Sequence, residues 1–194
     1  MKRQIRKNVF ETNSSSTHAI CISKENVYNK EDYVSFGIGE FGWKFAVYKD
    51  TDDKASYLIT AILGRSKEYA DEKLARLKQL LEENNIEYTL PELEEKSWEY
   101  NGQIHNYYEI DGYIDHAGET EEFVEAVLSD SESLMKYLFG DSFIVTGNDN
   151  SPEPYDDYFF NYEDEEVTNY GTYKRYSDEY KEEFNKYEIY EKGN

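Results

Sequence analysis

Cysteine is almost absent from this sequence, in which Cys21 is the single one among 194 residues. One cysteine excludes an internal disulfide framework and a zinc site built from cysteines. Because Cys21 lies in the apolar segment AICIS, we interpret it as a small buried side chain rather than a nucleophile. The sequence also lacks an apolar run of the about 18 residues that a membrane-spanning helix needs, and it lacks a hydrophobic leader segment. We therefore expect a protein of the reducing cytoplasm.

Basic residues are scarce as well. Lys and Arg total 21 against 42 Asp and Glu, which gives a formal net charge of −21. Such a chain repels nucleic-acid phosphates and anionic lipid headgroups, so we expect neither direct nucleic-acid binding nor membrane binding. Its electrostatic partners are cations or basic protein surfaces. The hydrophobic fraction of 38% is low, but twenty Tyr and ten Phe supply material for a core.

The pattern of apolar residues predicts an α+β fold, with a mainly antiparallel sheet packed on three to four helices. Strands are expected at HAICIS and SFIVTG, and helices at residues 54–63, 66–85, 120–130 and 131–140. Residues 33–48 alternate apolar side chains around three glycines, which predicts a bulged or tightly turned hairpin. We assign residues 1–149 to a single domain and residues 150–194 to an acidic, tyrosine-rich C-terminal extension, on the change of composition.

The segment FETNSSSTHAI contains the most distinctive candidate site. Consecutive small polar residues can turn their amides and hydroxyls toward an anion, which favours a phosphate-binding loop. In that hypothesis Asn13, Ser14, Ser16 and Thr17 bind the ligand, and Ser15 and His18 do the chemistry. A hydrated turn is the alternative, because the loop lacks the glycines and lysine of a P-loop.

Two later strings carry further candidate residues. Asp115 and His116 end an apolar run in GYIDHAGE, where they act as an acid and base pair, as metal ligands, or in a structural role alone. Adjacent residues on a strand point to opposite faces, which favours the structural role. Asn148 and Asp149 follow the strand expected at SFIVTG, and they are either ligand-binding groups or ordinary turn formers. The spacing of His18, Asp115, His116 and Asp149 identifies no particular metal, and the sequence assigns neither a cofactor nor an oligomeric state.

The strings NVFETNSSSTHAI, YIDHAG and FIVTGNDN, in this order, resemble a set of uncharacterised proteins encoded by bacteriophages and mobile elements of Gram-positive bacteria. The similarity spans about residues 9–150. It implies a phage or mobile-element origin, with the cytoplasm of the host cell as the place of action. It implies no reaction.

Acidic residues are concentrated between Glu87 and Ser133, where fourteen acids and one base give a net charge of −13 over 47 residues. Aromatic residues are interleaved with them, so the segment is not a simple acidic tail. Carboxylates spaced among aromatic rings can imitate the charge and stacking surfaces of a nucleic acid. The candidate partner-binding residues, which we expect to face solvent, are Glu94, Glu95, Glu99, Glu109 and Asp111.

Two hypotheses follow from these patterns. The first is a phage or mobile-element accessory protein that binds and inhibits a basic, nucleic-acid-handling host protein, such as a restriction or CRISPR component. The second is a small enzyme or ligand-binding module that acts on a phosphate-containing metabolite through the Asn13 to His18 loop with Asp115 and His116.

Overall fold

The computed structural model describes residues 16–115, 120–148, 162–168, 171–176 and 184–192. The fold is α+β, with a mainly antiparallel set of strands and four helices in these residues. No described helix is both long enough and apolar enough to cross a membrane.

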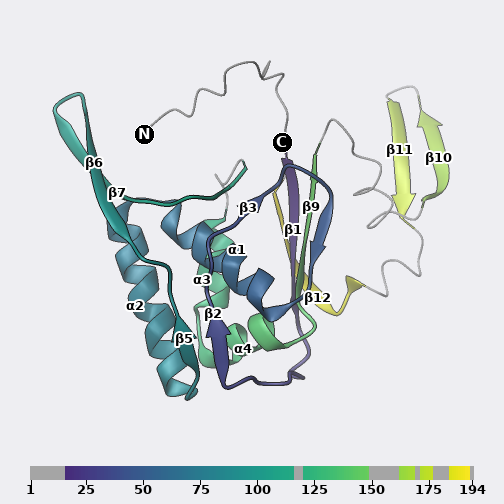
Figure 1. The fold of residues 1–194 in the computed structure, drawn as a ribbon. Helices are drawn as coiled ribbons and strands as arrows, with labels where there is room; N and C mark the ends of the chain where they lie inside the picture. The colour runs from purple at the N-terminus through teal and green to yellow at the C-terminus, as the bar shows by residue number, and fades with distance from the viewer. Residues whose placement is uncertain (1–15, 116–119, 149–161, 169–170, 177–183, 193–194) are drawn as a thin grey trace.

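A four-stranded antiparallel sheet forms one layer of the molecule, with strand order β12-β1-β9-β4 (Figure 1). Its strands are β1 (Ser16–Ser23), β4 (Ala46–Tyr48), β9 (Phe143–Asn148) and β12 (Tyr187–Lys192). Successive side chains of a strand point to opposite faces, and the core follows this rule. Ile20 and Ile22 join the large core beside the helices, whereas Ala19 and Cys21 join a smaller apolar cluster on the other face. Cys21 is buried, as we expected.

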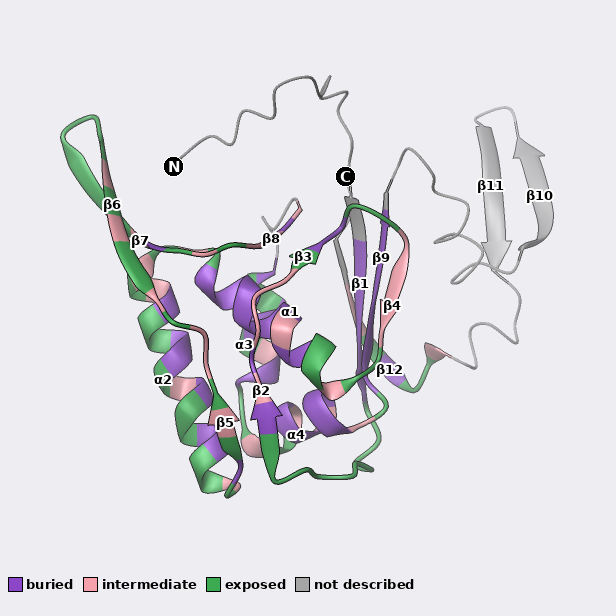
Figure 2. Cartoon of the chain, viewed as in Figure 1, coloured by how far each residue is buried: buried purple, intermediate pink, exposed green. Residues whose placement is uncertain are grey.

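Helix α1 (Thr51–Leu63) lies at the centre of the large core (Figures 1 and 2). Its run from Tyr57 to Leu63 is buried, so this helix is enclosed on most sides. It contacts α2 (Lys67–Glu83), α3 (Glu121–Val127) and α4 (Ser131–Phe139). The four helices correspond to the four that the apolar spacing predicts.

The predicted ends of the helices are partly correct. Ser66 caps α2, because its hydroxyl accepts a hydrogen bond from the Tyr69 amide, and Gly140 ends α4. Helix α1 follows Asp50, whose side chain makes no capping hydrogen bond. Thr120 precedes α3, but its hydroxyl makes no cap and accepts a hydrogen bond from Arg65 at 3.3 Å instead.

The hairpin predicted for residues 33–48 is wrong. Strand β2 (Tyr33–Ser35) pairs in parallel with β5 (Glu87–Thr89), and β3 (Glu40–Phe41) pairs in parallel with β8 (Tyr113–Ile114). Close backbone approach allows the second pairing, since a Cβ on Gly112 would lie 2.5 Å from the Gly39 carbonyl oxygen. The glycines of this segment therefore allow close backbone contact with strands that are distant in sequence, and they do not form a local hairpin turn.

Part of the predicted C-terminal extension belongs to the central sheet. Strand β12 pairs with β1 from His18 opposite Lys192 to Ser23 opposite Tyr187. Strands β10 (Tyr162–Thr168) and β11 (Gly171–Tyr176) form a separate antiparallel pair. The domain therefore includes a strand that lies beyond residue 149, and composition did not reveal it, because a short acidic edge strand resembles an acidic tail.

Candidate functional site

A long hairpin extends from the body of the molecule beside α2 (Figure 1). It consists of β6 (Glu94–Tyr100) and β7 (Gln103–Glu109), paired over seven positions. Asn101 and Gly102 join the strands, with φ of 51° and 76°. Two positive φ values in a two-residue connection are those of a type I′ turn, which Asn-Gly favours. No strand ranges were predicted for these residues, although Asn-Gly between two β-like runs is a hairpin signal.

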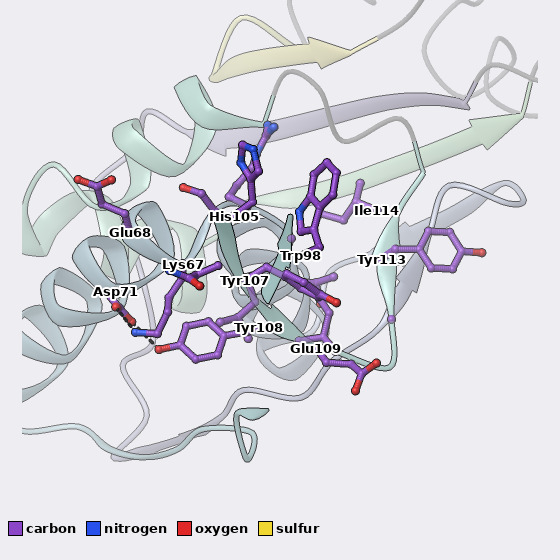
Figure 3. Close-up of a pocket in the computed structure, with 18 of the residues that line it drawn as sticks. Lys67, Glu68, Asp71, Trp98, His105, Tyr107, Tyr108, Glu109, Tyr113 and Ile114 are labelled. Carbon is purple, nitrogen blue, oxygen red and sulfur yellow. Dashed lines mark hydrogen bonds and ion pairs between the residues drawn. The ribbon is translucent and has the colours of Figure 1, made fainter. Parts of the chain in front are cut away.

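Ion pairs and hydrogen bonds attach the base of the hairpin to α2. The Tyr108 hydroxyl donates to Asp71 at 2.5 Å, and Lys67 Nζ lies 2.7 Å from Asp71 (Figure 3). Lys67 Nζ also lies 3.3 Å from Glu95. These contacts lower the pKa of Asp71, with the Lys67 bond as the largest cause. The hydrogen bond to Asp71 also raises the pKa of the Tyr108 hydroxyl. The hairpin is thus anchored at its base.

The five candidate partner-binding carboxylates all face solvent, as predicted, and four of them lie on this hairpin. The strand register divides those four between two faces. Glu94 lies opposite Glu109, and Lys96 contacts both carboxylates from the same face, with 3.5 Å to Glu109. Glu95 and Glu99 lie on the other face. The negative charge therefore surrounds a thin ribbon instead of covering one surface.

Aromatic rings occupy one face of the hairpin toward its tip. Trp98 lies opposite His105 and stacks on it, with ring centroids 4.9 Å apart, and the Tyr100 ring lies 5.7 Å from Trp98. Tyr100 is 58% exposed, and Ile104 on the other face is 71% exposed. Aromatic side chains are enriched in protein-binding surfaces, where exposed apolar groups supply contact area. Figure 2 shows that exposure continues along most of the ribbon.

A pocket of about 1170 Å³ lies between the hairpin and the start of α2 (Figure 3). The end of α1 and the chain from β7 to β8 complete its walls. Neither His18 nor Asp115 lines it. Its aromatic and charged lining residues are Glu40, Arg65, Lys67, Glu68, Asp71, Trp98, His105, Tyr107, Tyr108, Glu109, Asp111 and Tyr113.

A second polar cluster is buried where β1 begins. His18 has no exposed surface, and its Nδ1 atom lies 3.1 Å from the Tyr57 hydroxyl of α1. Gly42 lies against the ring, since a Cβ there would be 2.7 Å from His18 Nε2 and 2.9 Å from the Asp115 Cβ. His18 and Asp115 therefore lie next to the same glycine, which brings together two of the predicted catalytic residues. Burial of His18 argues against a catalytic role, because a general acid or base must come within hydrogen-bond reach of its substrate.

The sheet also aligns two of the strings that the sequence analysis singled out. In the β1–β9 pairing Ser16 lies opposite Asn148, and His18 lies opposite Thr146. The end of the Ser-rich segment and the end of FIVTGN therefore meet at one end of the sheet. The other predicted residues of this site lie outside the described part of the chain, namely Asn13, Ser14, Ser15, His116 and Asp149. For Ser16, Thr17 and Asn148, the structure describes the backbone pairing alone.

Metal ligands do not gather within the described residues, where no group of three or more His, Cys, Asp or Glu side chains could hold an ion. Comparisons with protein-family models, with curated proteins and with solved structures found no match to this chain.

Proposed function

We propose that the protein binds a basic partner protein through the hairpin β6–β7. The observation that carries this proposal is the arrangement of solvent-facing carboxylates around an anchored, projecting ribbon that also exposes Tyr100 and Ile104. An exposed apolar tip supplies contact area, and the surrounding charge selects for a positive surface.

The partner that fits this charge best is a nucleic-acid-handling host protein. Its groove for phosphates is basic, and a chain with a net charge of −21 competes for such a groove with the nucleic acid itself. The resemblance to phage and mobile-element proteins supports an inhibitory role against a host system, such as a restriction or CRISPR component. Inhibition then follows from occupation of the groove, without a chemical reaction.

Neutralising three carboxylates of the hairpin together with the nearby Asp111 tests the proposal. The variant carries Glu94→Gln, Glu95→Gln, Glu99→Gln and Asp111→Asn, and it is compared with the parent in capture from a bacterial lysate. We expect the parent to retain a nucleic-acid-binding protein that a DNA oligonucleotide displaces, and the variant to lose it. Capture should also weaken between 0.1 M and 1 M salt, because the Debye length falls from about 10 Å to about 3 Å.

A matched control separates local charge from total charge. Glu25→Gln, Asp52→Asn, Glu87→Gln and Glu122→Gln change four exposed residues outside the hairpin and shift the net charge equally. This control should capture the partner as the parent does. Equal loss in both variants, or no displacement by DNA, would contradict binding through the hairpin.

A phosphate-binding module is the second candidate function. It is favoured by the meeting of Ser16 with Asn148 at one end of the sheet and by the placement of His18 and Asp115 next to Gly42. Calorimetry with inorganic phosphate and with nucleotides tests it, and Ser15→Asp should weaken binding by like-charge repulsion. Absence of heat at millimolar ligand with the parent protein rules this candidate out.

A further inference from the structure

The pocket beside the hairpin has the lining that an arginine side chain requires. Resting on the partner-binding function proposed above, we propose that this pocket receives an arginine-bearing segment of the basic partner. Arginine, rather than lysine, is then the residue that the hairpin recognises.

The aromatic residues that line the pocket favour a cationic ligand. Trp98, His105 and Tyr107 lie on one face of the hairpin, where the first two are stacked (Figure 3). Tyr108 lines the pocket from the other face. A cation within about 6 Å of an aromatic ring is attracted by its π face. The pocket already contains one such contact, since Lys67 Nζ lies 5.3 Å from the centre of the Tyr108 ring. Its chemistry is therefore suited to cations.

The charges of the lining favour the same occupant. Five carboxylates line the pocket against two bases, Arg65 and Lys67. Both bases already have acidic neighbours: Lys67 pairs with Asp71 and Glu95, and Arg65 lies 3.7 Å from Glu121. Glu40, Glu68 and Asp111 form no ion pair with any residue that the structure describes. A positive ligand would gain these carboxylates as partners.

The shape of the occupant follows from geometry and size. A guanidinium is flat, stacks on aromatic rings and donates five hydrogen bonds in fixed directions, whereas an ammonium is compact and more strongly hydrated. A wall of rings beside carboxylates therefore favours arginine over lysine. The pocket, at about 1170 Å³, exceeds the about 300 to 1,000 Å³ typical of small-molecule sites, so a peptide segment fits its size.

Tryptophan fluorescence gives a direct test. The chain has two tryptophans, Trp43 and Trp98, so Trp43→Phe leaves Trp98 as the reporter at the pocket. This protein is titrated with deca-arginine and with deca-lysine, which carry the same side-chain charge. We expect deca-arginine to bind about tenfold more tightly and to change the Trp98 emission, because a stacked cation adds to the shared charge attraction.

Two variants locate the preference. In Trp98→Leu, the affinities for the two peptides should differ by no more than about twofold, because the main aromatic ring is lost while the charge is kept. These affinities are measured by competition of each unlabelled peptide with a fluorescein-labelled deca-arginine. Tyr28→Leu, at an exposed tyrosine outside both the hairpin and the pocket lining, should keep the preference for arginine. Circular dichroism checks that both variants fold. If Trp98→Leu does not fold, the comparison of the two peptides on the Trp43→Phe protein still tests the preference for arginine.

The outcomes distinguish this inference from the proposed function. Equal affinity for both peptides, with weaker binding after the four-residue neutralisation, overturns arginine recognition and leaves the basic-partner function in place. Binding of both peptides that is insensitive to that neutralisation overturns both. A preference for arginine that survives Trp98→Leu places the recognition elsewhere and contradicts the role of the pocket.

Discussion

Gly42→Ala is expected to destabilise the protein by about 3 kcal/mol or more. Two costs add at this position. Its φ of 106° lies in the region that L residues rarely adopt, which costs roughly 1 kcal/mol or more for alanine. The new methyl would also lie 2.7 Å from His18 Nε2 and 2.9 Å from the Asp115 Cβ, and overpacking of this kind costs about 1 to 3 kcal/mol.

The neighbours of Gly42 have little freedom to move away. His18 is fully buried and is held by the 3.1 Å contact between its Nδ1 atom and the Tyr57 hydroxyl. Asp115 is held by its amide, which donates to the Phe41 carbonyl at 2.8 Å. A methyl group at Gly42 must therefore displace the polar cluster rather than a flexible surface side chain.

Gly102→Ala is the matched control, measured together with Gly42→Ala by urea denaturation. Gly102 also has a positive φ, of 76°, but a Cβ there meets no atom within 4 Å. This variant should lose about 1 kcal/mol, from the backbone term alone. The difference between the two variants isolates the packing around His18 and Asp115, and equal losses would contradict the close approach at Gly42.

The elements that local patterns specify were predictable from the sequence. Helix α2 is the clearest case, because Leu74, Leu77 and Leu81 recur at helical spacing and all three are buried. Ser66 and Gly140 mark helix ends through hydrogen bonding and backbone conformation close in sequence. The exposure of Glu94 and its neighbours followed from the cost of burying unpaired charge.

The elements that depend on distant partners were not predictable in the same way. Nothing within residues 33–48 indicates that β2 pairs with β5 or that β3 pairs with β8. The same holds for β12, which joins β1 from the far end of the chain. Such pairings depend on the tertiary packing of both strands, so the sequence of one strand alone does not identify its partner.

The candidate site shows both situations. His18 and Asp115 were selected by residue type and sequence context, and the structure places both of them next to Gly42. The burial of His18 was not foreseeable, because it depends on Tyr57 of α1 and on the central sheet. Conversely, the Asn101-Gly102 turn was visible in the sequence, and it positions the hairpin on which the proposed function rests.

Lys54 gives the protein a pH-dependent contribution to stability. Its side chain is 2% exposed, and Nζ donates to the Gly140 carbonyl at 3.0 Å. Burial lowers the pKa of this lysine from 10.5 to about 8, against the opposing attraction of Asp141 and Asp50. Below pH 8 the lysine is charged in the folded protein, which therefore bears the full free-energy cost of burying this charge. As the pH rises, the folded protein releases the proton at a lower pH than the unfolded chain does.

The sign of the effect follows from proton counting. Between pH 8 and 10.5 the unfolded chain binds more protons at Lys54 than the folded protein does, so stability contributed by this residue increases with pH. We expect the difference in unfolding free energy between the parent and Lys54→Met to shift by about 2 kcal/mol in favour of the parent from pH 7 to pH 10. Other titrating groups, including the tyrosines, are common to both proteins and cancel in this difference. Lys78→Met, at an exposed position of α2, should run parallel to the parent over the same range. Urea denaturation at the two pH values measures the shift, and parallel behaviour of parent and Lys54→Met would show that this lysine keeps its solvation on folding.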